Sequence, residues 1–288
     1  MIPAAFGYSR PASLDEAFRI LREHGDSAKI LAGGQSLLPL LKLRVAHTEH
    51  LVDIGRLREL AFIREEAGGG ITIGSLTTYR EVLDSPLAAA RAPLLVEAVL
   101  DIGDVQVRNR GTVGGSLAHA DPASDLPAVA LALDAQIVAI SGRGERLINI
   151  TDYFTGSFET VLQHHELLAS IRFPALPQGA GTAYRILPQP ASGYSIIGCA
   201  AVIARSGGKI SYARVALTGA SDVAYRATAV EEGLVGTDGS AKAIAAAAAH
   251  ATSNRMVTSD IHADRQYRAQ MAQVFARRAV EAALAKSA

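Results

Sequence analysis

Two pairs of adjacent glycines, each close to a hydroxyl side chain, are the residues whose types and spacing could do chemistry. The first pair, Gly33-Gly34, follows a short apolar segment and precedes Gln35-Ser36. The second pair, Gly114-Gly115, precedes Ser116 and follows Thr112. Glycine permits positive φ and lacks the Cβ that would block close approach to the backbone, and successive N–H groups in such a turn can bind an anion. Each pair alone is compatible with a tight turn, but two in matching contexts suit a pyrophosphate.

The common nucleotide-binding and metal-binding motifs are absent from the sequence. No G-x-G-x-x-G follows a strand, because "GRGERL" has Leu147 in the last glycine position, and no Walker sequence is present. The adjacent side chains of 164–166 (His-His-Glu) do not point the same way, so we interpret them as surface or structural residues. His119, Asp121 and Asp125 share one loop that suits cofactor or turn chemistry better than a metal. We therefore predict no metal site.

Composition excludes several classes of function. The 288 residues include 28 acidic and 28 basic side chains, so no net charge draws the chain to nucleic acid or to an anionic membrane. Residues 108–110 (Arg-Asn-Arg) are a local exception, interpreted as a structural or partner-facing surface. Cys199 is the only cysteine, which rules out an intrachain disulfide and a cysteine-held iron–sulfur cluster. There is no basic-then-apolar leader and no apolar run of about 18 residues, so we expect a cytoplasmic protein.

Periodicity and capping residues in the first half predict mixed helices and strands. "SLDEAFRILREHG" predicts a helix that begins after Ser13 and ends at Gly25, and "AKIL" and "HLVDI" predict strands. We expect a hairpin that turns at residues 68–70, a helix over 86–102 and a loop over 103–125.

The second half has the same mixed character. A segment rich in proline and glycine near Pro174 predicts a domain junction. "YSIIGCAAVIAR" and "GKISYARVALTGA" predict antiparallel neighbours joined at Gly207-Gly208, and "DRQYRAQMAQVFARRAVEAALAK" predicts a long terminal helix. No repeat of 20–50 residues is visible. The pattern is α+β throughout.

Two stretches identify a family resemblance. "AGGQSLLPLLKLR" and "IGDVQVRNRGTVGGSLAHADPASDLPA" closely resemble the FAD-binding medium subunit of the molybdenum hydroxylases, the group of carbon monoxide dehydrogenase, quinoline oxidoreductase and the xanthine dehydrogenase flavin domain. The resemblance covers nearly the whole chain, including "FGYSRPASLDEAFRIL", "ELLASIRFP" and the terminal helix. It implies a two-lobed FAD-binding fold of the vanillyl-alcohol-oxidase (PCMH) type over 1–175, with lobes of roughly 1–55 and 56–175. A smaller α/β C-terminal flavoprotein domain is implied over 176–288.

The resemblance also implies which residues hold FAD. One side of its pyrophosphate would contact Ala32, Gly33, Gly34, Gln35, Ser36 and Leu37, and the other side Thr112, Gly114, Gly115 and Ser116. Ile102 would lie against the cofactor, Asp125 would hydrogen-bond it, and Leu168 would lie at the adenine end. On this hypothesis Gly34 is a glycine because a phosphate occupies the place of its side chain.

One departure from the family pattern lies in "AYRILPQPASGY". Relatives commonly carry a lysine near the flavin, whereas Ile186 takes that position here and Arg185 precedes it. Either Arg185 supplies the positive charge near the flavin or the site does without one. Tyr194 aligns with a tyrosine near the isoalloxazine ring in some relatives, and an ordinary strand aromatic is an equally good interpretation.

The function implied by the resemblance is electron transfer within a heteromeric complex. Electrons from substrate oxidised at a molybdopterin cofactor on a large subunit would pass through [2Fe–2S] clusters on a small subunit to FAD here, and then to quinone, NAD or oxygen. Partners would assemble as a dimer of heterotrimers. No catalytic acid, base or nucleophile is then required of this chain. The alternatives are a self-sufficient flavin-dependent oxidase or dehydrogenase and a non-enzymatic nucleotide-binding scaffold.

Overall fold

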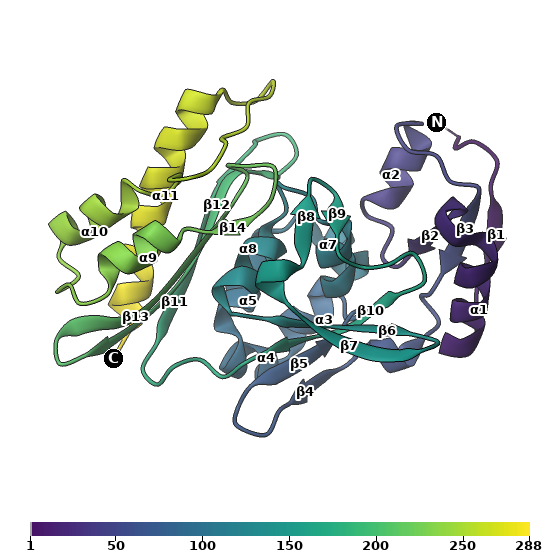
Figure 1. Ribbon diagram of the computed structural model, residues 1–288, viewed down its shortest axis with the longest axis horizontal. Coiled ribbons are helices and arrows are strands. Elements are labelled where there is room, and N and C mark those ends of the chain that lie inside the picture. The colour runs from purple at the N-terminus through teal and green to yellow at the C-terminus, as the bar shows by residue number, and fades with distance from the viewer. Residues whose placement is uncertain (1) are drawn as a thin grey trace.

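The computed structural model describes residues 2–288, which form three successive parts, each built on its own sheet (Figure 1). In Figure 1 the N-terminal part lies at the right, the middle part at the centre and the C-terminal part at the left. Helices and strands are mixed in all three parts, as the sequence predicts. No helix within residues 2–288 combines the length and the apolar character that a membrane crossing requires.

The N-terminal part is a three-stranded parallel sheet with strand order β1-β3-β2. Its elements are β1 (Gly7–Ser9), α1 (Leu14–His24), η1 (Gly25–Ser27), β2 (Ala28–Leu31), α2 (Leu37–Lys42) and β3 (His50–Asp53). Ser13 Oγ accepts a hydrogen bond from Glu16 N at 3.3 Å and caps α1, which ends at Gly25 with φ of 52°. Both ends of this helix confirm the sequence prediction.

The middle part is a five-stranded sheet with strand order β4-β5-β10-β6-β7. Its strands are β4 (Ile63–Glu65), β5 (Ile71–Gly74), β6 (Gln136–Ser141), β7 (Gly144–Asn149) and β10 (Leu167–Phe173), and a separate hairpin joins β8 (Phe154–Gly156) to β9 (Glu159–Thr160). The helices are η2 (Arg58–Leu60), α3 (Tyr79–Asp84), α4 (Pro86–Arg91), α5 (Pro93–Asp101), α6 (Val105–Arg110), α7 (Val113–His119), α8 (Asp125–Ala132) and η3 (Ile150–Asp152). The expected hairpin at residues 68–70 joins β4 to β5.

Two sequence predictions in the middle part need correction. The helix expected over 86–102 is interrupted at Ala92, because Pro93 disfavours helical conformation in the residue before it and starts a new helix. The loop expected over 103–125 contains α6 and α7. Asp104 and Thr112 cap these helices by accepting hydrogen bonds from Val107 N at 2.8 Å and Gly115 N at 3.1 Å. Sequence analysis missed both helix caps because this segment is rich in glycine.

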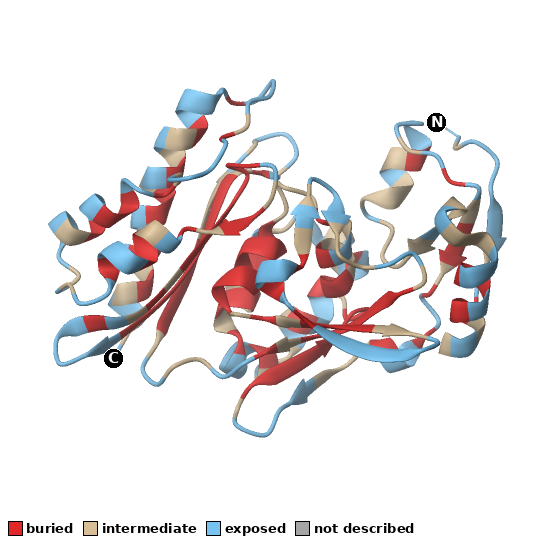
Figure 2. Cartoon of the chain, in the orientation of Figure 1, coloured by how far each residue is buried: buried red, intermediate tan, exposed pale blue. Residues whose placement is uncertain are grey.

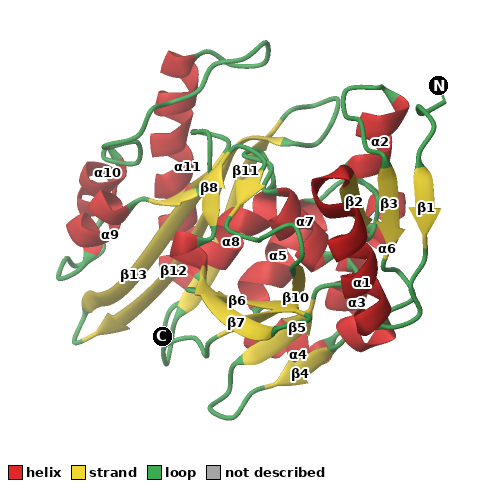
Figure 3. Ribbon diagram, turned by 45° about the vertical axis from the view of Figure 1, so that its right-hand side comes forward, coloured by secondary structure: helices red, strands yellow, loops and turns green. Residues whose placement is uncertain are grey.

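The C-terminal part is an antiparallel sheet with strand order β11-β12-β13-β14. Its elements are β11 (Gly181–Pro188), β12 (Ser195–Ser206), β13 (Lys209–Thr218), β14 (Tyr225–Arg226), α9 (Thr228–Leu234), α10 (Ala241–Ala248) and α11 (Arg265–Lys286). Helices α9, α10 and α11 share one apolar core with this sheet, and the other face packs on α5 and α8 of the middle part (Figure 3). All eight residues of α8 are buried (Figure 2), because elements pack on it from both sides.

Candidate functional site

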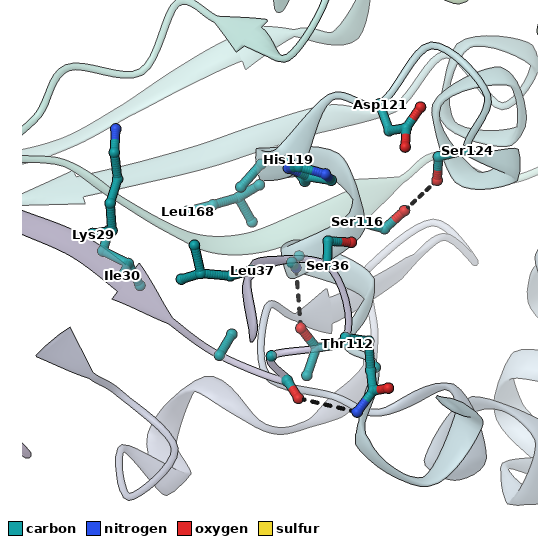
Figure 4. Close-up of a pocket in the computed structure, with 18 of the residues that line it drawn as sticks. Lys29, Ile30, Ser36, Leu37, Thr112, Ser116, His119, Asp121, Ser124 and Leu168 are labelled. Carbon is teal, nitrogen blue, oxygen red and sulfur yellow. Dashed lines mark hydrogen bonds between the residues drawn. The ribbon is translucent and has the colours of Figure 1, made fainter. Parts of the chain in front are cut away.

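The main cavity lies where the three parts meet and has a volume of about 610 Å³. This size falls within the roughly 300–1,000 Å³ that small-molecule and cofactor sites occupy. The wall includes the turn between β2 and α2, the segment after β5, α7 with the loop that follows it, the start of β10, and the loop between β11 and β12. Figure 4 shows labelled side chains from β2, from the start of α2, from α7 and the loop after it, and from β10 around one space.

The first glycine turn connects β2 to α2 and leaves its backbone donors unused. Gly34 has φ of 76°, a conformation that favours glycine. Within residues 2–288, none of the N–H groups of residues 33–36 donates a hydrogen bond to a protein acceptor. Residues 33, 34 and 36 are half-buried and Gln35 is exposed. Their N–H groups are therefore available to water or to a bound anion.

The second glycine pair lies in the first turn of α7 and differs from the first. Neither Gly114 nor Gly115 has positive φ. Gly114 N donates to Ser75 O at 3.0 Å, and Gly115 N donates to Thr112 Oγ1 at 3.1 Å (Figure 4). These amides already have acceptors, so this side of the cavity offers hydroxyl hydrogens rather than a second set of free N–H groups.

Protein atoms, and not an empty space, explain why these positions are glycines. A Cβ on Gly33 would lie 2.2 Å from Arg110 O, and one on Gly114 would lie 2.3 Å from Ser75 Cβ. A Cβ on Gly34 would lie 2.9 Å from Leu38 Cδ1. The leucine side chains that a Gly34 Cβ would meet, together with the positive φ of this residue, therefore give a reason for glycine that requires no phosphate in its place. The glycines let the two turns pack closely, and that packing places the free amides.

Asp125 is a buried carboxylate in the cavity wall, at the first residue of α8. Its Oδ1 accepts hydrogen bonds from Tyr184 OH at 2.5 Å and from Ser195 Oγ at 2.6 Å. Loss of hydration on burial raises the pKa of Asp125 to about 6, against the opposing effect of these hydroxyls. Both donors belong to the C-terminal part, so these hydrogen bonds connect that part to a residue of the cavity wall.

The neighbouring loop contributes further polar groups. Ser116 Oγ and Ser124 Oγ share a hydrogen bond of 2.8 Å, and His119 and Asp121 also line the cavity (Figure 4). Burial lowers the pKa of His119, which favours its neutral form near neutral pH. Ser75 is a further wall residue, and its buried Oγ has no hydrogen-bond partner within the described chain.

The C-terminal part also sends one loop into the cavity wall. Between β11 and β12, Gln189 N donates to Tyr194 O and Gly193 N donates to Gln189 O, each at 2.8 Å. This closed loop places Ser192, Gly193 and Tyr194 in the wall, with Tyr194 45% exposed.

The structure brings together fourteen of the fifteen residues that the sequence proposes for cofactor binding. Those in the cavity wall are Ala32, Gly33, Gly34, Gln35, Ser36, Leu37, Ile102, Thr112, Gly114, Gly115, Ser116, Asp125, Leu168 and Tyr194. Arg185 is not in the wall, which corrects the proposal that it supplies charge there. Successive side chains of a strand face opposite sides. Since Tyr184 faces Asp125, Arg185 turns away and pairs with Glu97 at 2.7 Å.

Several wall residues were missed by sequence reasoning. They include Lys29, His47, Ser75, Tyr79, Phe158 and Gln163. None belongs to a motif, and most reach the cavity through sheet topology. One signal was available: "SLTTYRE" follows a strand and contains the capping pattern of Thr78 and Glu81, which fixes the direction of Tyr79.

Comparisons with known proteins agree along the whole chain. Residues 4–176 match the family described as the FAD binding domain in molybdopterin dehydrogenase, and residues 182–283 match the CO dehydrogenase flavoprotein C-terminal domain. The carbon monoxide dehydrogenase medium chain of Hydrogenophaga pseudoflava is 41% identical over 288 residues, covering 100% of both chains.

Solved structures give the same result. Carbon monoxide dehydrogenase from Hydrogenophaga pseudoflava, in a form that lacks the Mo-pyranopterin moiety, matches with a TM-score of 0.97 and 42% identity over 100% of each chain. Quinoline 2-oxidoreductase from Pseudomonas putida 86 matches with a TM-score of 0.92 and 33% identity over 99% of each chain. The chain therefore belongs to the family of FAD-binding medium subunits of the molybdenum hydroxylases.

Proposed function

We propose that this chain binds FAD in the main cavity and serves as the electron-transfer flavoprotein subunit of a molybdenum hydroxylase. The observation that carries the proposal is the turn at residues 33–36, whose four free N–H groups border a cavity that also presents the hydroxyls of Thr112 and Ser116. Free donors on one side and hydroxyl hydrogens on the other suit a pyrophosphate bound between them.

Each group of wall residues has a distinct role in this proposal. The amides of residues 33–36 donate to phosphate oxygens, and Thr112 Oγ1, which accepts from Gly115 N, keeps its own hydrogen for the ligand. Leu168 and its neighbours form the apolar wall for the adenine. Asp125, fixed by Tyr184 and Ser195, accepts from a cofactor hydroxyl. Bound FAD supplies the chemistry, since a flavin can take up electrons singly and release them as a pair.

We also propose the finer architecture. The parallel sheet of residues 7–53 and the antiparallel sheet of residues 63–173 correspond to the two lobes of a PCMH-type FAD-binding domain over 1–175. Residues 176–288 form the C-terminal flavoprotein domain. The family matches, which end at residue 176 and resume at residue 182, support a boundary there.

The proposed partners follow from what this chain lacks. Cys199 is buried and is the only cysteine of the sequence, so [2Fe–2S] clusters require an iron–sulfur small subunit. A molybdopterin large subunit completes a dimer of heterotrimers in the cytoplasm, which delivers electrons to quinone, NAD or oxygen. Relatives named for carbon monoxide and for quinoline share this fold. That pairing of one fold with different substrates supports placing substrate oxidation on another subunit.

The test compares the FAD-loaded chain alone with the chain co-expressed with its iron–sulfur and molybdopterin partners. Aldehydes, N-heterocycles and CO are offered to both, and flavin absorbance is followed without oxygen. We expect dithionite to bleach the chain alone and no organic substrate to do so, whereas the complex bleaches with its substrate. Bleaching of the isolated chain by an organic substrate would favour the self-sufficient oxidase instead.

A further inference from the structure

A second cavity, here the basic cavity, has a volume of about 500 Å³ and is lined by four basic side chains and a glycine. Arg22 comes from the last turn of α1, Gly142 and Arg143 from the turn between β6 and β7, and His164 and His165 from the loop before β10. Figure 1 shows α1 beside the right-hand ends of β6 and β7. The N-terminal and middle parts together therefore build this cavity.

Contacts within the fold bring the basic groups close together. A Cβ on Gly142 would lie 2.7 Å from Arg22 Nη1, so the guanidinium of Arg22 lies against the backbone of the turn that carries Arg143. The rings of His164 and His165 pack edge to face, with their centroids 5.1 Å apart. Glycine at position 142 thus leaves the room in which the guanidinium from α1 meets the turn from the middle part.

Protein carboxylates leave most of the positive charge of the basic cavity unneutralised. Within residues 2–288, neither Arg22 nor Arg143 has a carboxylate oxygen within 4.0 Å of its guanidinium, and neither guanidinium donates a hydrogen bond to a protein acceptor. The carboxylate that does approach the cluster is Asp26, which lies 3.7 Å from His164 Nδ1 and has a side chain that is 95% exposed. Both guanidinium groups are exposed, so a ligand from solution can reach them.

The acidic residues that flank the cluster in the sequence are paired with other arginines. Glu23, next to Arg22, pairs with Arg19 at 3.3 Å. Glu166, next to His165, pairs with Arg146 at 2.8 Å. Like charges that are gathered without a counter-ion repel one another, and an anion with more than one charge turns this repulsion into attraction. The basic cavity is therefore suited to a multivalent anion.

We propose that the basic cavity binds a phosphate-bearing small molecule, with a phosphate group held between Arg22 and Arg143. The planar fork of guanidinium donors matches two phosphate oxygens at once, and each imidazole has at least one N–H donor in either protonation state. The volume of about 500 Å³ lies within the roughly 300–1,000 Å³ of small-molecule sites. This site is additional to the proposed FAD site, because Arg22 and Arg143 do not line the main cavity, although His164 lines both.

The experiment uses the FAD-saturated full chain, so that the main cavity is filled before any probe is added. Pyrophosphate, ADP and citrate are titrated by calorimetry into the wild type and into the double variant Arg22→Gln/Arg143→Gln. The matched control is Arg56→Gln/Arg58→Gln, which removes the same charge from two exposed arginines that line neither cavity. Thermal unfolding of each protein is measured alongside, and the two single variants of the basic cavity are titrated as well.

We expect the wild type to bind one pyrophosphate or one ADP per chain, and citrate about tenfold more weakly than pyrophosphate. The double variant should raise the pyrophosphate dissociation constant about tenfold or more, and each single variant should raise it by less. The control pair should leave it unchanged. All variants should unfold near the wild-type temperature, because the substituted side chains are exposed and form no salt bridge. Tighter binding of ADP than of pyrophosphate would identify the ligand as a nucleotide, and equal binding would assign recognition to the phosphates alone.

Other outcomes overturn the proposal in distinguishable ways. No saturable binding of either phosphate probe, or equal pyrophosphate affinity in the double variant and the control, would show that the basic cavity is a solvated surface. Citrate that binds as tightly as pyrophosphate would assign the cavity to carboxylates, such as those of an acidic protein segment. Arg22 and Arg143 lie outside the main cavity, so the comparison of variants holds even for a chain that takes up no FAD, and the failure of one proposal leaves the other standing.

Discussion

Asp125→Asn should change how the stability of the chain depends on pH, because the carboxylate is buried and forms no salt bridge with a side chain of residues 2–288. Burial raises the pKa of Asp125 from 3.8 to about 6. At pH values between these two, the folded chain binds more protons at this site than the unfolded chain does. The contribution of Asp125 to the free energy of unfolding therefore falls as the pH rises through this window.

The magnitude follows from the size of the shift. A change from 3.8 to about 6 is about two pKa units, and each unit corresponds to about 1.4 kcal/mol. Ionised Asp125 should thus cost the fold about 3 kcal/mol above pH 6, and protonated Asp125 should cost nothing below about pH 4. Asparagine keeps an oxygen that accepts from Tyr184 and Ser195 and carries no charge.

The assay is urea unfolding of the wild-type and Asp125→Asn apoproteins at pH values from about 4 to 8. The free energy of unfolding of wild type minus that of the variant should fall by about 3 kcal/mol with rising pH and stay level above about pH 7. A difference that does not vary with pH would refute the account of this carboxylate.

Glu166 offers a control of opposite sign. Its hydrogen bonds with Arg146 lower its pKa below 4.5. A carboxyl with a depressed pKa stabilises the fold above its unfolded pKa and loses that contribution as the pH falls. The stability difference between wild type and Glu166→Gln should therefore increase as the pH rises.

Two further substitutions test the packing of the site. Gly114→Ala should lower the free energy of unfolding of the apoprotein by about 1–3 kcal/mol, because its Cβ would lie 2.3 Å from Ser75 Cβ; wild-type stability in urea would contradict the packing reason for this glycine. Arg185→Met should leave the FAD dissociation constant unchanged, because the guanidinium pairs with Glu97 outside the cavity wall. A tenfold larger FAD dissociation constant in a fluorescence titration would show that Arg185 contributes to FAD binding.

Local signals predicted much of the fold. Helix α1 could be predicted because Ser13 and Gly25 mark its two ends and its apolar pattern is local. Strands β12 and β13 could be predicted because they are adjacent in sequence and joined by the turn at Gly207-Gly208. The helices inside 103–125 were missed because glycines lower helix propensity. Gly114 is required there by its close packing against Ser75, a residue far away in sequence. Tertiary contacts, which local sequence patterns do not show, therefore determine the structure of residues 103–125.

The site was predicted in the same uneven way. The two glycine turns indicated where the cavity wall runs, but not why glycine is needed there. Gly33 faces Arg110, and this contact depends on how the first part packs on the second. Arg185 was misplaced because the alternation of β11 is fixed by Tyr184, whose partner Asp125 lies in another part of the chain. Tyr79 belongs to neither glycine motif, and its place in the cavity wall depends on the packing of α3 against the segment around Gly111.

The central claim is that this chain binds FAD through its glycine turns without a covalent bond, and one measurement tests it directly. The chain is purified with its flavin, precipitated with acid, and the supernatant is analysed by chromatography against the protein concentration. We expect one FAD per chain, all of it in the supernatant, because the wall of the cavity offers hydrogen-bond donors and apolar contacts to the cofactor. Flavin that stays with the pellet, FMN in place of FAD, or no flavin uptake at all would contradict the account.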